Sequence, residues 1–332
     1  MNSNGQSLLQ IRDLAVEFTT DDGIVQAVNG VSYDVPAGHA IGIVGESGSG
    51  KSVSQLAVMR LVARPAGRIT SGEVLFEGTN LLDLNDAEMR RIRGNQIAII
   101  FQDPMNSLNP VYTVGKQIEE SLRLHQGVTK IEARARAVEL LDLVGIPSPS
   151  DRIKDYPHQL SGGMQQRAMI AMAISCNPQL LIADEPSTAL DVTIQAQVIE
   201  LLAELRSKLN MAVILITHDL ALVAGFCDEV AVMYAGYIVE QGPARDIFYN
   251  PKHPYTLGLL GSVPNLTSDR TERLTAIPGT PPDMLALPVG CPYADRCSFA
   301  RDECRTSVPT LDEIDDKHTI RCLVDVSTGN LR

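Results

Sequence analysis

A glycine-rich stretch near the start of the chain could bind phosphate. Residues 45–52 read GESGSGKS and fit the pattern G-x-x-x-x-G-K-[ST]. Glycines let successive backbone N–H groups turn inward around an anion, and a following helix start adds partial positive charge. The apolar run AIGIV precedes the stretch and the helix-like SVSQLAVMRLVA follows it. This context predicts that Lys51 reaches the β- and γ-phosphates of a nucleotide and that the Ser52 hydroxyl binds Mg²⁺.

Two adjacent carboxylates end a second apolar run, LLIADEP at residues 180–186. On its own, an acidic pair after a strand is more typical of a loop or a helix cap. The phosphate-binding pattern elsewhere in the chain favours a catalytic interpretation. Asp184 is then predicted to hold the magnesium shell, and Glu185 to polarise the attacking water as a general base.

A second anion-binding surface is predicted at residues 160–167, LSGGMQQR. Ser161, Gly162 and Gly163 combine a hydroxyl, two bare backbones and the start of a helix. A chain that binds one nucleotide has no need of two phosphate-binding surfaces.

Short apolar runs position these residues. Continuous apolarity at 40–44, 97–101, 180–183 and 212–216 predicts strands covered on both faces, as in a parallel sheet. Ligands of such sheets bind beyond the carboxyl ends of the strands. One shared site is therefore predicted from the polar pairs that follow the runs: Gly45-Glu46, Gln102-Asp103, Asp184-Glu185 and Thr217-His218.

Other elements complete a mixed α/β fold. Alternating apolar residues before position 36, the stretch 73–78 and a hairpin over 229–242 predict antiparallel strands. Helices are predicted at 130–144 and 194–209. Beyond about residue 245 the chain is rich in proline and without strong helical periodicity, which predicts a small irregular extension.

Composition excludes several classes of protein. The 332 residues include 28 basic and 40 acidic side chains, a net charge of −12 that argues against a broad nucleic-acid surface. The opening MNSNGQSLLQ shows no export signal, and the longest apolar runs, such as MAVILI, are too short for a membrane helix. We expect a soluble protein of the cytoplasm.

The motifs, in this order, resemble the ATP-binding cassette (ABC) family, whose signature is LSGGQ; Met164 stands where Gln is common. The resemblance covers about residues 8–245 and implies a P-loop ATPase core with an antiparallel β subdomain and a helical subdomain at about 103–160. It also implies two nucleotides sandwiched in a head-to-tail dimer.

The resemblance assigns roles residue by residue. Lys51, Glu185 and His218 are implied in catalysis, and Ser52, Gln102 and Asp184 in binding Mg²⁺. The implied nucleotide-binding set is Phe18, Gly45, Glu46, Ser47, Gly48, Ser49, Gly50, Lys51, Ser52, Gln102 and Asp184. The implied set acting on the partner's nucleotide is Ser161, Gly162, Gly163, Gln165 and Asp191.

Three further stretches resemble the dipeptide, oligopeptide and nickel importer branch of the family: FQDPMNSLNP, YPHQLSGGMQQR and NPKHPYTLGLL. The branch implies a second, paralogous ATPase subunit, two transmembrane permease subunits and an extracytoplasmic solute-binding protein. It places the chain peripherally on the cytoplasmic face of the cell membrane. The His-Pro-Tyr stretch has no chemistry of its own and could equally be a rigid surface turn.

Four cysteines gather in the extension at 246–332: Cys291, Cys297, Cys304 and Cys322. A reducing compartment favours metal binding over disulfides, and a small segment gains folding energy from a metal. The intervals are looser than zinc sites prefer. Thiolates also suit an iron–sulfur cluster, and the resemblance implies a [4Fe–4S] cluster here. Zinc, disulfides and unligated thiols stay open.

Alternative functions follow from the same motifs. The machine could import nickel, an oligosaccharide or another small solute, because the permease and the binding protein select the solute. A soluble ABC ATPase of DNA repair or translation would have two cassettes, a long coiled coil or a basic face, and the sequence has none of these. The extension could also sense redox state or iron and gate the ATPase.

Overall fold

The computed structural model describes residues 7–103, 107–186, 191–262, 276–315 and 317–332. The chain divides into two compact units. Unit 1 comprises Met1–Asp34, Ile41–Leu82 and Thr217–Arg332, and unit 2 comprises Val35–Ala40 and Asp83–Ile216. The C-terminal extension thus belongs to the same unit as the glycine-rich loop. The two compact units do not coincide with the predicted domains at 8–245 and 246–332, and these domain boundaries stay a prediction.

An antiparallel sheet of unit 1 has the strand order β2-β1-β4-β5. Its strands are β1 (Leu9–Thr20), β2 (Gly23–Val35), β4 (Gly67–Phe76) and β5 (Thr79–Asn80). The predicted alternation along β1 is confirmed, with one step of three residues between buried Ile11 and Leu14. The register against β4 shifts there, and Asp13 has a φ of 47°. This β-bulge keeps both apolar side chains on the buried face.

A second group of strands in unit 1 has the order β11-β12-β10-β9-β3. The strands are β3 (Ala40–Val44), β9 (Glu229–Tyr234), β10 (Tyr237–Pro243), β11 (Asp312–Asp315) and β12 (His318–Ile320). β3 and β9 pair in parallel, and β9 and β10 form the predicted hairpin. Ala235 and Gly236 turn this hairpin with φ values of 47° and 81°.

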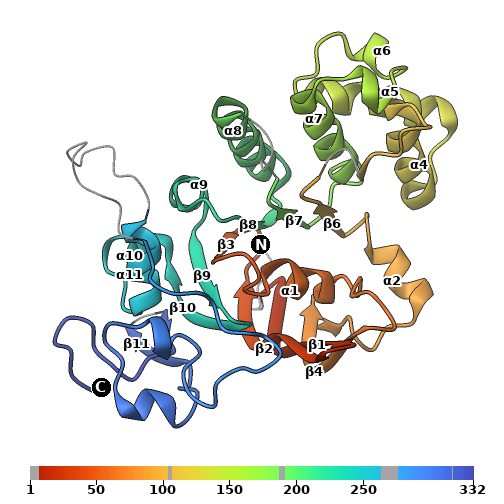
Figure 1. The fold of residues 1–332 in the computed structure, drawn as a ribbon. Helices are drawn as coiled ribbons and strands as arrows, with labels where there is room; N and C mark the ends of the chain where they lie inside the picture. Colours follow the sequence, from red (N-terminus) through yellow and green to blue (C-terminus); the bar gives the residue numbers. More distant parts are fainter. Residues whose placement is uncertain (1–6, 104–106, 187–190, 263–275, 316) are drawn as a thin grey trace. The chain divides into compact units, whose positions relative to one another are not determined.

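The helices of unit 1 are short. They are α1 (Lys51–Val58), α9 (Leu220–Phe226), α10 (Ala244–Tyr249) and α11 (Pro254–Gly261), with 3-10 turns at Ala294–Arg296 and Asp302–Arg305. In Figure 1 the C-terminal chain, in blue, folds beside β10, where β12 pairs with it. The extension predicted as irregular therefore adds strands to the sheet.

Unit 2 contains a parallel sheet in the order β8-β7-β6. The strands are β6 (Ile97–Ile100), β7 (Leu180–Asp184) and β8 (Ala212–Ile216). Every residue of β7 and β8 is buried. The predicted parallel strands covered on both faces are confirmed.

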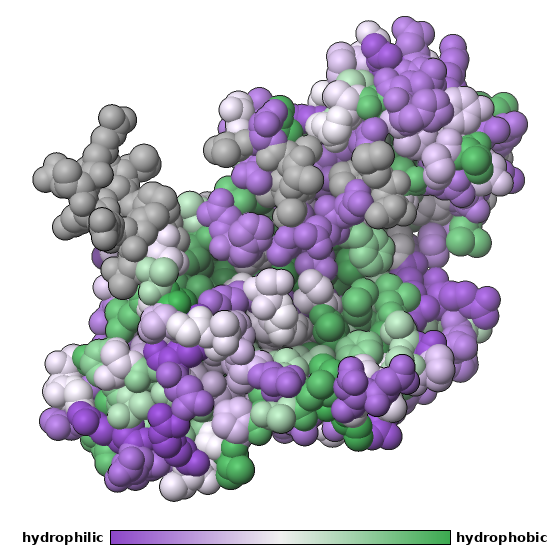
Figure 2. Space-filling view, viewed as in Figure 1, coloured by the Kyte–Doolittle hydropathy of each residue, from purple (hydrophilic) through white to green (hydrophobic). Residues whose placement is uncertain are grey.

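Helices α4 to α7 gather into one cluster of unit 2, and Figure 1 shows them together. Asn85 and Thr129 begin two helices of the unit with capping boxes, each satisfying backbone N–H groups that lack helical partners. Figure 2 shows mostly hydrophilic residues over this cluster on the face drawn. The helices are α2 (Asp86–Ile92), α4 (Val114–Gln126), α5 (Lys130–Leu143), α6 (Pro149–Arg152), α7 (Gly162–Ala173) and α8 (Val192–Leu209), with a 3-10 turn at Pro157–Gln159.

A buried polar cluster holds the start of α11 against β10. The Glu240 carboxylate is fully buried and accepts hydrogen bonds from the backbone N–H groups of Lys252 and His253 at 2.6 and 3.0 Å. The His318 ring lies 2.8 Å from the same carboxylate. His253 caps α11 by accepting the Tyr255 N–H at Nδ1, 3.1 Å away. The His-Pro-Tyr stretch is therefore buried and is not a surface turn.

Burial makes the fold sensitive to acid at His253. Burial lowers the pKa of His253 to about 4, since a charged imidazolium would lose its hydration and its acceptor Nδ1. The neutral ring stabilises the fold fully above an unfolded pKa of about 6.5, and this contribution is lost as pH falls toward the folded value. We expect the free energy of unfolding to drop by about 2 kcal/mol between pH 7 and pH 5 from this group.

Denaturant unfolding followed by tyrosine fluorescence measures this drop, because the chain has no tryptophan. His253→Asn removes the titrating ring while keeping a capping oxygen, so its stability should fall less over the same pH range. His158→Asn, at an exposed position, is the matched control. Equal pH dependence in His253→Asn and in the unaltered chain would contradict the assignment.

Candidate functional site

The glycine-rich loop of unit 1 connects the buried strand β3 to helix α1. Gly45 has a φ of 153°, and a Cβ there would lie 2.1 Å from the Met233 carbonyl oxygen. Gly50, with a φ of 97°, would place a Cβ 2.3 Å from the Ala27 carbonyl oxygen. Both ends of the loop therefore require glycine, because packed backbone leaves no room for a side chain.

The Lys51 side chain turns back into this loop. Its ammonium donates hydrogen bonds to the carbonyl oxygens of Gly45 at 2.8 Å and Glu46 at 2.9 Å. Lys51 is only 6% exposed. The Ser49 hydroxyl is also buried and has no hydrogen-bond partner among the described residues. A buried cation and an unpaired hydroxyl in one loop are suited to an anionic ligand that offers oxygen atoms.

Glu46 of the same loop is bound to other parts of unit 1 through both its backbone and its side chain. Its backbone N–H donates to the Tyr255 hydroxyl at 2.8 Å, and its carboxylate accepts two hydrogen bonds from Arg296. The hydrogen bonds to Glu46 raise the pKa of Arg296 above its ordinary value. Sequence reasoning counted Glu46 in the nucleotide set and missed Arg296, since the two lie 250 positions apart.

Three predicted magnesium and catalytic residues lie together in unit 2. The Gln102 side-chain amide donates to the Glu185 carboxylate at 2.9 Å. Gln102 and Asp184 line a cavity of about 540 Å³. The Glu185 backbone has a φ of 46°, a left-handed conformation that costs about 1–2 kcal/mol. Backbone strain of this kind is found at functional positions.

The signature stretch begins helix α7 in unit 2. Ser161 is exposed at the N-terminus of the helix and accepts the Met164 N–H at its side-chain oxygen. Gln165 donates from its amide to the carbonyl oxygens of Pro157 and Leu160 at 2.9 and 3.1 Å. Gln165 thus holds the preceding turn, while Ser161 and Gly162 stay exposed to a ligand.

The other predicted site residues are Phe18, His218 and Asp191. Phe18, half-buried in β1, packs so closely on Gly67 that a Cβ there would lie 2.7 Å from the ring. His218 is exposed after Thr217 in unit 1. Asp191 is exposed at the start of α8, and residues 187–190 of the same predicted stretch lie outside the described residues.

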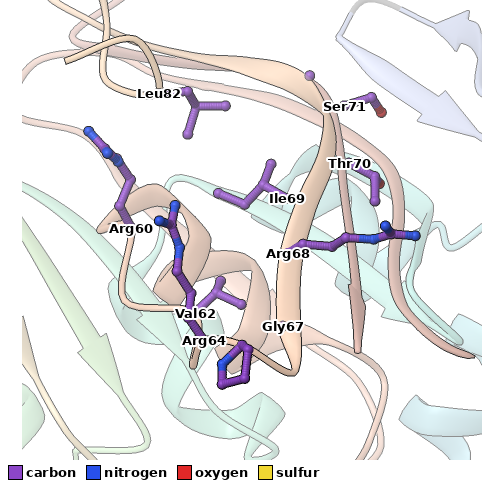
Figure 3. Close-up of a pocket in the computed structure, with 11 residues that line it drawn as sticks. Arg60, Val62, Arg64, Gly67, Arg68, Ile69, Thr70, Ser71 and Leu82 are labelled. Atoms are coloured by element: carbon purple, nitrogen blue, oxygen red, sulfur yellow. The ribbon is translucent and has the colours of Figure 1, made fainter. Parts of the chain in front are cut away.

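A cavity of about 590 Å³ in unit 1 contains none of the predicted motifs. Figure 3 shows Arg60 and Arg64 on one side of β4, near Ile69 and Leu82. Arg68 extends to the other side, and its guanidinium pairs with Glu17 at 3.0 Å. The arginines of this cavity therefore do not converge on one ligand.

Four cysteines of the extension line one small cavity of unit 1, in the company of Tyr293, Phe299 and Val324. Burial, together with the neighbouring thiols, raises the pKa of Cys291 to about 12 and that of Cys322 to about 11. In the part of the chain that the structure describes, no group of three or more His, Cys, Asp or Glu side chains is placed to hold a metal ion. Among the described residues the four thiols therefore share one cavity without forming a site for a single metal ion. The two other cysteines, Cys176 and Cys227, are buried as predicted.

Known proteins share this combination of fold and motifs. Residues 28–188 match the model of the ABC transporter family, and residues 239–304 match the oligopeptide/dipeptide transporter C-terminal region. The oligopeptide transport ATP-binding protein OppD of Bacillus subtilis is 53% identical over 95% of this chain and 88% of its own length. The chain belongs to the ABC transporter family. Its C-terminal match places it with the oligopeptide/dipeptide transporters of that family.

Other relatives agree with this ABC assignment. The dipeptide transport ATP-binding protein DppD of Escherichia coli is 52% identical over 95% of this chain and 96% of its own length. Among solved structures, the ATP-binding cassette MJ0796, a dimer bound to ADP and phosphate, is 28% identical with a TM-score of 0.64. That likeness covers 71% of this chain and 99% of MJ0796. The predicted P-loop ABC fold is confirmed.

As an ABC ATP-binding protein, the chain binds and hydrolyses ATP. No helix of the described residues is long and apolar enough to cross a membrane.

Proposed function

We propose that this chain powers the import of dipeptides or oligopeptides through an ABC permease. The observation that carries the proposal is the oligopeptide/dipeptide transporter region at residues 239–304, which follows the cassette. Relatives over 50% identical along nearly the whole chain are named as oligopeptide and dipeptide transport proteins. This extension is not expected in an ABC ATPase of another kind.

Nucleotide phosphates are held by the loop of unit 1. Lys51 exchanges its carbonyl partners for β- and γ-phosphate oxygens, and backbone N–H groups at the start of α1 add donors. Mg²⁺ would neutralise charge on the phosphates, and its protein partners would be Ser52, Gln102 and Asp184. Phe18 stacks on adenine.

Glu185 accepts a proton from the attacking water. Gln102 holds the Glu185 carboxylate by the 2.9 Å hydrogen bond, which orients it for this transfer. His218 contacts the γ-phosphate. Most of the rate enhancement comes from fixed charges and donors around the transferring phosphoryl group.

A second ATPase subunit completes each site. The exposed N-terminus of the twelve-residue helix α7 faces the nucleotide of the partner and is formed by Ser161, Gly162, Gly163 and Gln165. Asp191 acts across the same interface. We propose a paralogue as that partner. ATP binding then joins the two subunits and hydrolysis separates them.

Two permease subunits dock on unit 2 near Gln102. The apolar side chains of Val111 and Tyr112 are 70% and 48% exposed on the stretch that follows Gln102. Adjacent exposed apolar side chains support a protein contact at this stretch. This docking holds the chain peripherally at the cytoplasmic face of the cell membrane, and an extracytoplasmic binding protein delivers the peptide.

Thiolates of Cys291, Cys297, Cys304 and Cys322 hold a [4Fe–4S] cluster, with Zn²⁺ as the alternative. The support is the donor set, since four thiols line a single cavity. Binding would release protons, because burial raises the pKa of Cys297 and of Cys291 and keeps both thiols protonated.

Cys297→Ser is expected to abolish the brown absorption and the iron content of anaerobically purified protein, because one of four cluster ligands is lost. Absorption spectra and iron and sulfide analysis measure this. Cys176→Ser, a buried thiol of unit 2, is the matched control and should keep its iron. If the unaltered protein is colourless and contains stoichiometric zinc, the site is a zinc site. If the unaltered protein contains no metal, both assignments are wrong.

The proposed function is tested by deleting the gene in its host. Cells without it should fail to use dipeptides or oligopeptides as an amino-acid source, while growth on free amino acids is unchanged. Unchanged use of peptides, combined with loss of nickel or oligosaccharide uptake, would assign another solute.

A further inference from the structure

Arg296 of the C-terminal extension reaches the phosphate-binding loop. Its guanidinium donates to both oxygens of the Glu46 carboxylate, at 2.6 and 3.0 Å. This two-pronged geometry is the strongest form of ion pair between side chains. Both residues belong to unit 1.

The Arg296 side chain is fixed on every side. It is 5% exposed, donates from Nε to the Pro278 carbonyl oxygen at 2.8 Å, and contacts the Tyr234 hydroxyl at 3.2 Å. Its guanidinium carbon lies 5.7 and 5.9 Å from the ring centres of Tyr234 and Tyr293. An arginine so constrained loses little further entropy when it holds Glu46.

The backbone of Glu46 is held by the same region. Tyr255, fully buried, accepts its N–H at 2.8 Å. The rings of Tyr234, Tyr255 and Tyr293 pack together with centres 4.6 to 5.3 Å apart. The first turn of the loop therefore contacts a cluster of aromatic rings contributed by β9 and the extension.

Charge gives Arg296 a role beyond packing. Glu46 is a carboxylate inside a loop whose ligand is a polyanion, and the Glu46 side chain is only 28% exposed. An unpaired carboxylate there would repel the phosphates, and partial burial would limit screening by solvent.

We propose that Arg296 is a positioning residue for the phosphate-binding loop, which it completes by holding and neutralising Glu46. The inference rests on the proposed binding of nucleotide phosphates at this loop. Arg296 stands directly before Cys297, in a 3-10 turn whose neighbouring N–H of Ala294 bonds to the Cys291 carbonyl oxygen at 3.0 Å. The fold of the cysteine-bearing segment thus sets the position of Arg296 and, through it, the affinity for nucleotide.

Arg296→Met tests the proposal in the full-length chain. We expect the Kd for MgATP, measured by calorimetry, to rise about tenfold, since an uncompensated Glu46 carboxylate is left beside the phosphates. The number of binding sites should stay the same, and the KM for ATP should rise with kcat changed less than twofold. Higher salt concentration should reduce the difference in Kd between Arg296→Met and the unaltered chain, because salt screens the repulsion.

A rescue distinguishes charge neutralisation from mere structure. Adding Glu46→Gln to Arg296→Met removes the uncompensated charge and should restore most of the lost affinity. Arg305→Met is the matched control: Arg305 is a 54%-exposed arginine of the same segment that pairs with Asp295. Its Kd should match that of the unaltered chain.

Three outcomes decide the matter. The inference is overturned if the Kd for MgATP of both Arg296→Met and Arg296→Lys lies within twofold of the unaltered value. It is also overturned if the double variant binds MgATP more weakly than Arg296→Met alone. If Arg296→Met does not fold, the Kd of Arg296→Lys, which keeps the charge but loses the two-pronged geometry, decides in its place. If the unaltered chain binds no MgATP, the proposed nucleotide site itself fails.

Discussion

Replacing Glu185 with Gln is expected to slow ATP hydrolysis by about 10²–10⁴-fold, because the general base is lost. The glutamine has the same shape and can still hydrogen-bond to Gln102, so binding of MgATP should be retained. The variant should also stay joined to its partner subunit, since separation follows hydrolysis. Phosphate release and the Kd for MgATP measure the two effects separately.

Glu204→Gln is the control for this variant, because Glu204 is an exposed carboxylate of the same unit paired with Lys208. Its hydrolysis rate should equal that of the unaltered chain. Undiminished turnover in Glu185→Gln would refute the assignment of Glu185 as the base.

Lys51→Ala is expected to weaken binding of MgATP by about 100-fold or more, because charge-assisted hydrogen bonds to the phosphates are lost. The change should affect ATP more than adenosine, which carries no phosphate. The buried position of Lys51 inside the loop, with its ammonium held by two carbonyl oxygens, supports this role.

Lys116→Ala, at an exposed position on α4, is the matched control and should bind MgATP normally. Thermal unfolding of both variants shows whether each is folded. Normal ATP affinity in a folded Lys51→Ala variant would count against the phosphate-binding role of the loop.

Local patterns predicted much of this fold. The buried runs at 40–44, 180–183 and 212–216 are strands within one residue of the predicted bounds, because continuous apolarity in short segments has few other uses. The glycines at 45 and 50 were predictable too, since the motif depends on backbone that approaches its surroundings closely.

The pairing of segments far apart in the chain could not be predicted from the sequence. Strands β11 and β12 are short and rich in polar residues. They are strands only because β12 pairs with β10 and β11 pairs with β12. The contact between Arg296 and Glu46 joins distant segments with ordinary charged residues, and nothing local distinguishes them from solvated side chains. His253 and Tyr255 offered a recognisable pattern, but their burial behind the loop is a tertiary property.

Transport in reconstituted vesicles tests the central claim most directly. Vesicles containing the permease, both ATPase subunits and the binding protein would be supplied with labelled peptides of two to five residues, and uptake and ATP hydrolysis would be measured together. We predict that peptide accumulates only with ATP, and that Glu185→Gln stops both accumulation and hydrolysis. ATP-dependent accumulation of nickel or a sugar with no peptide of any length taken up, or peptide uptake undiminished in Glu185→Gln, would contradict the account.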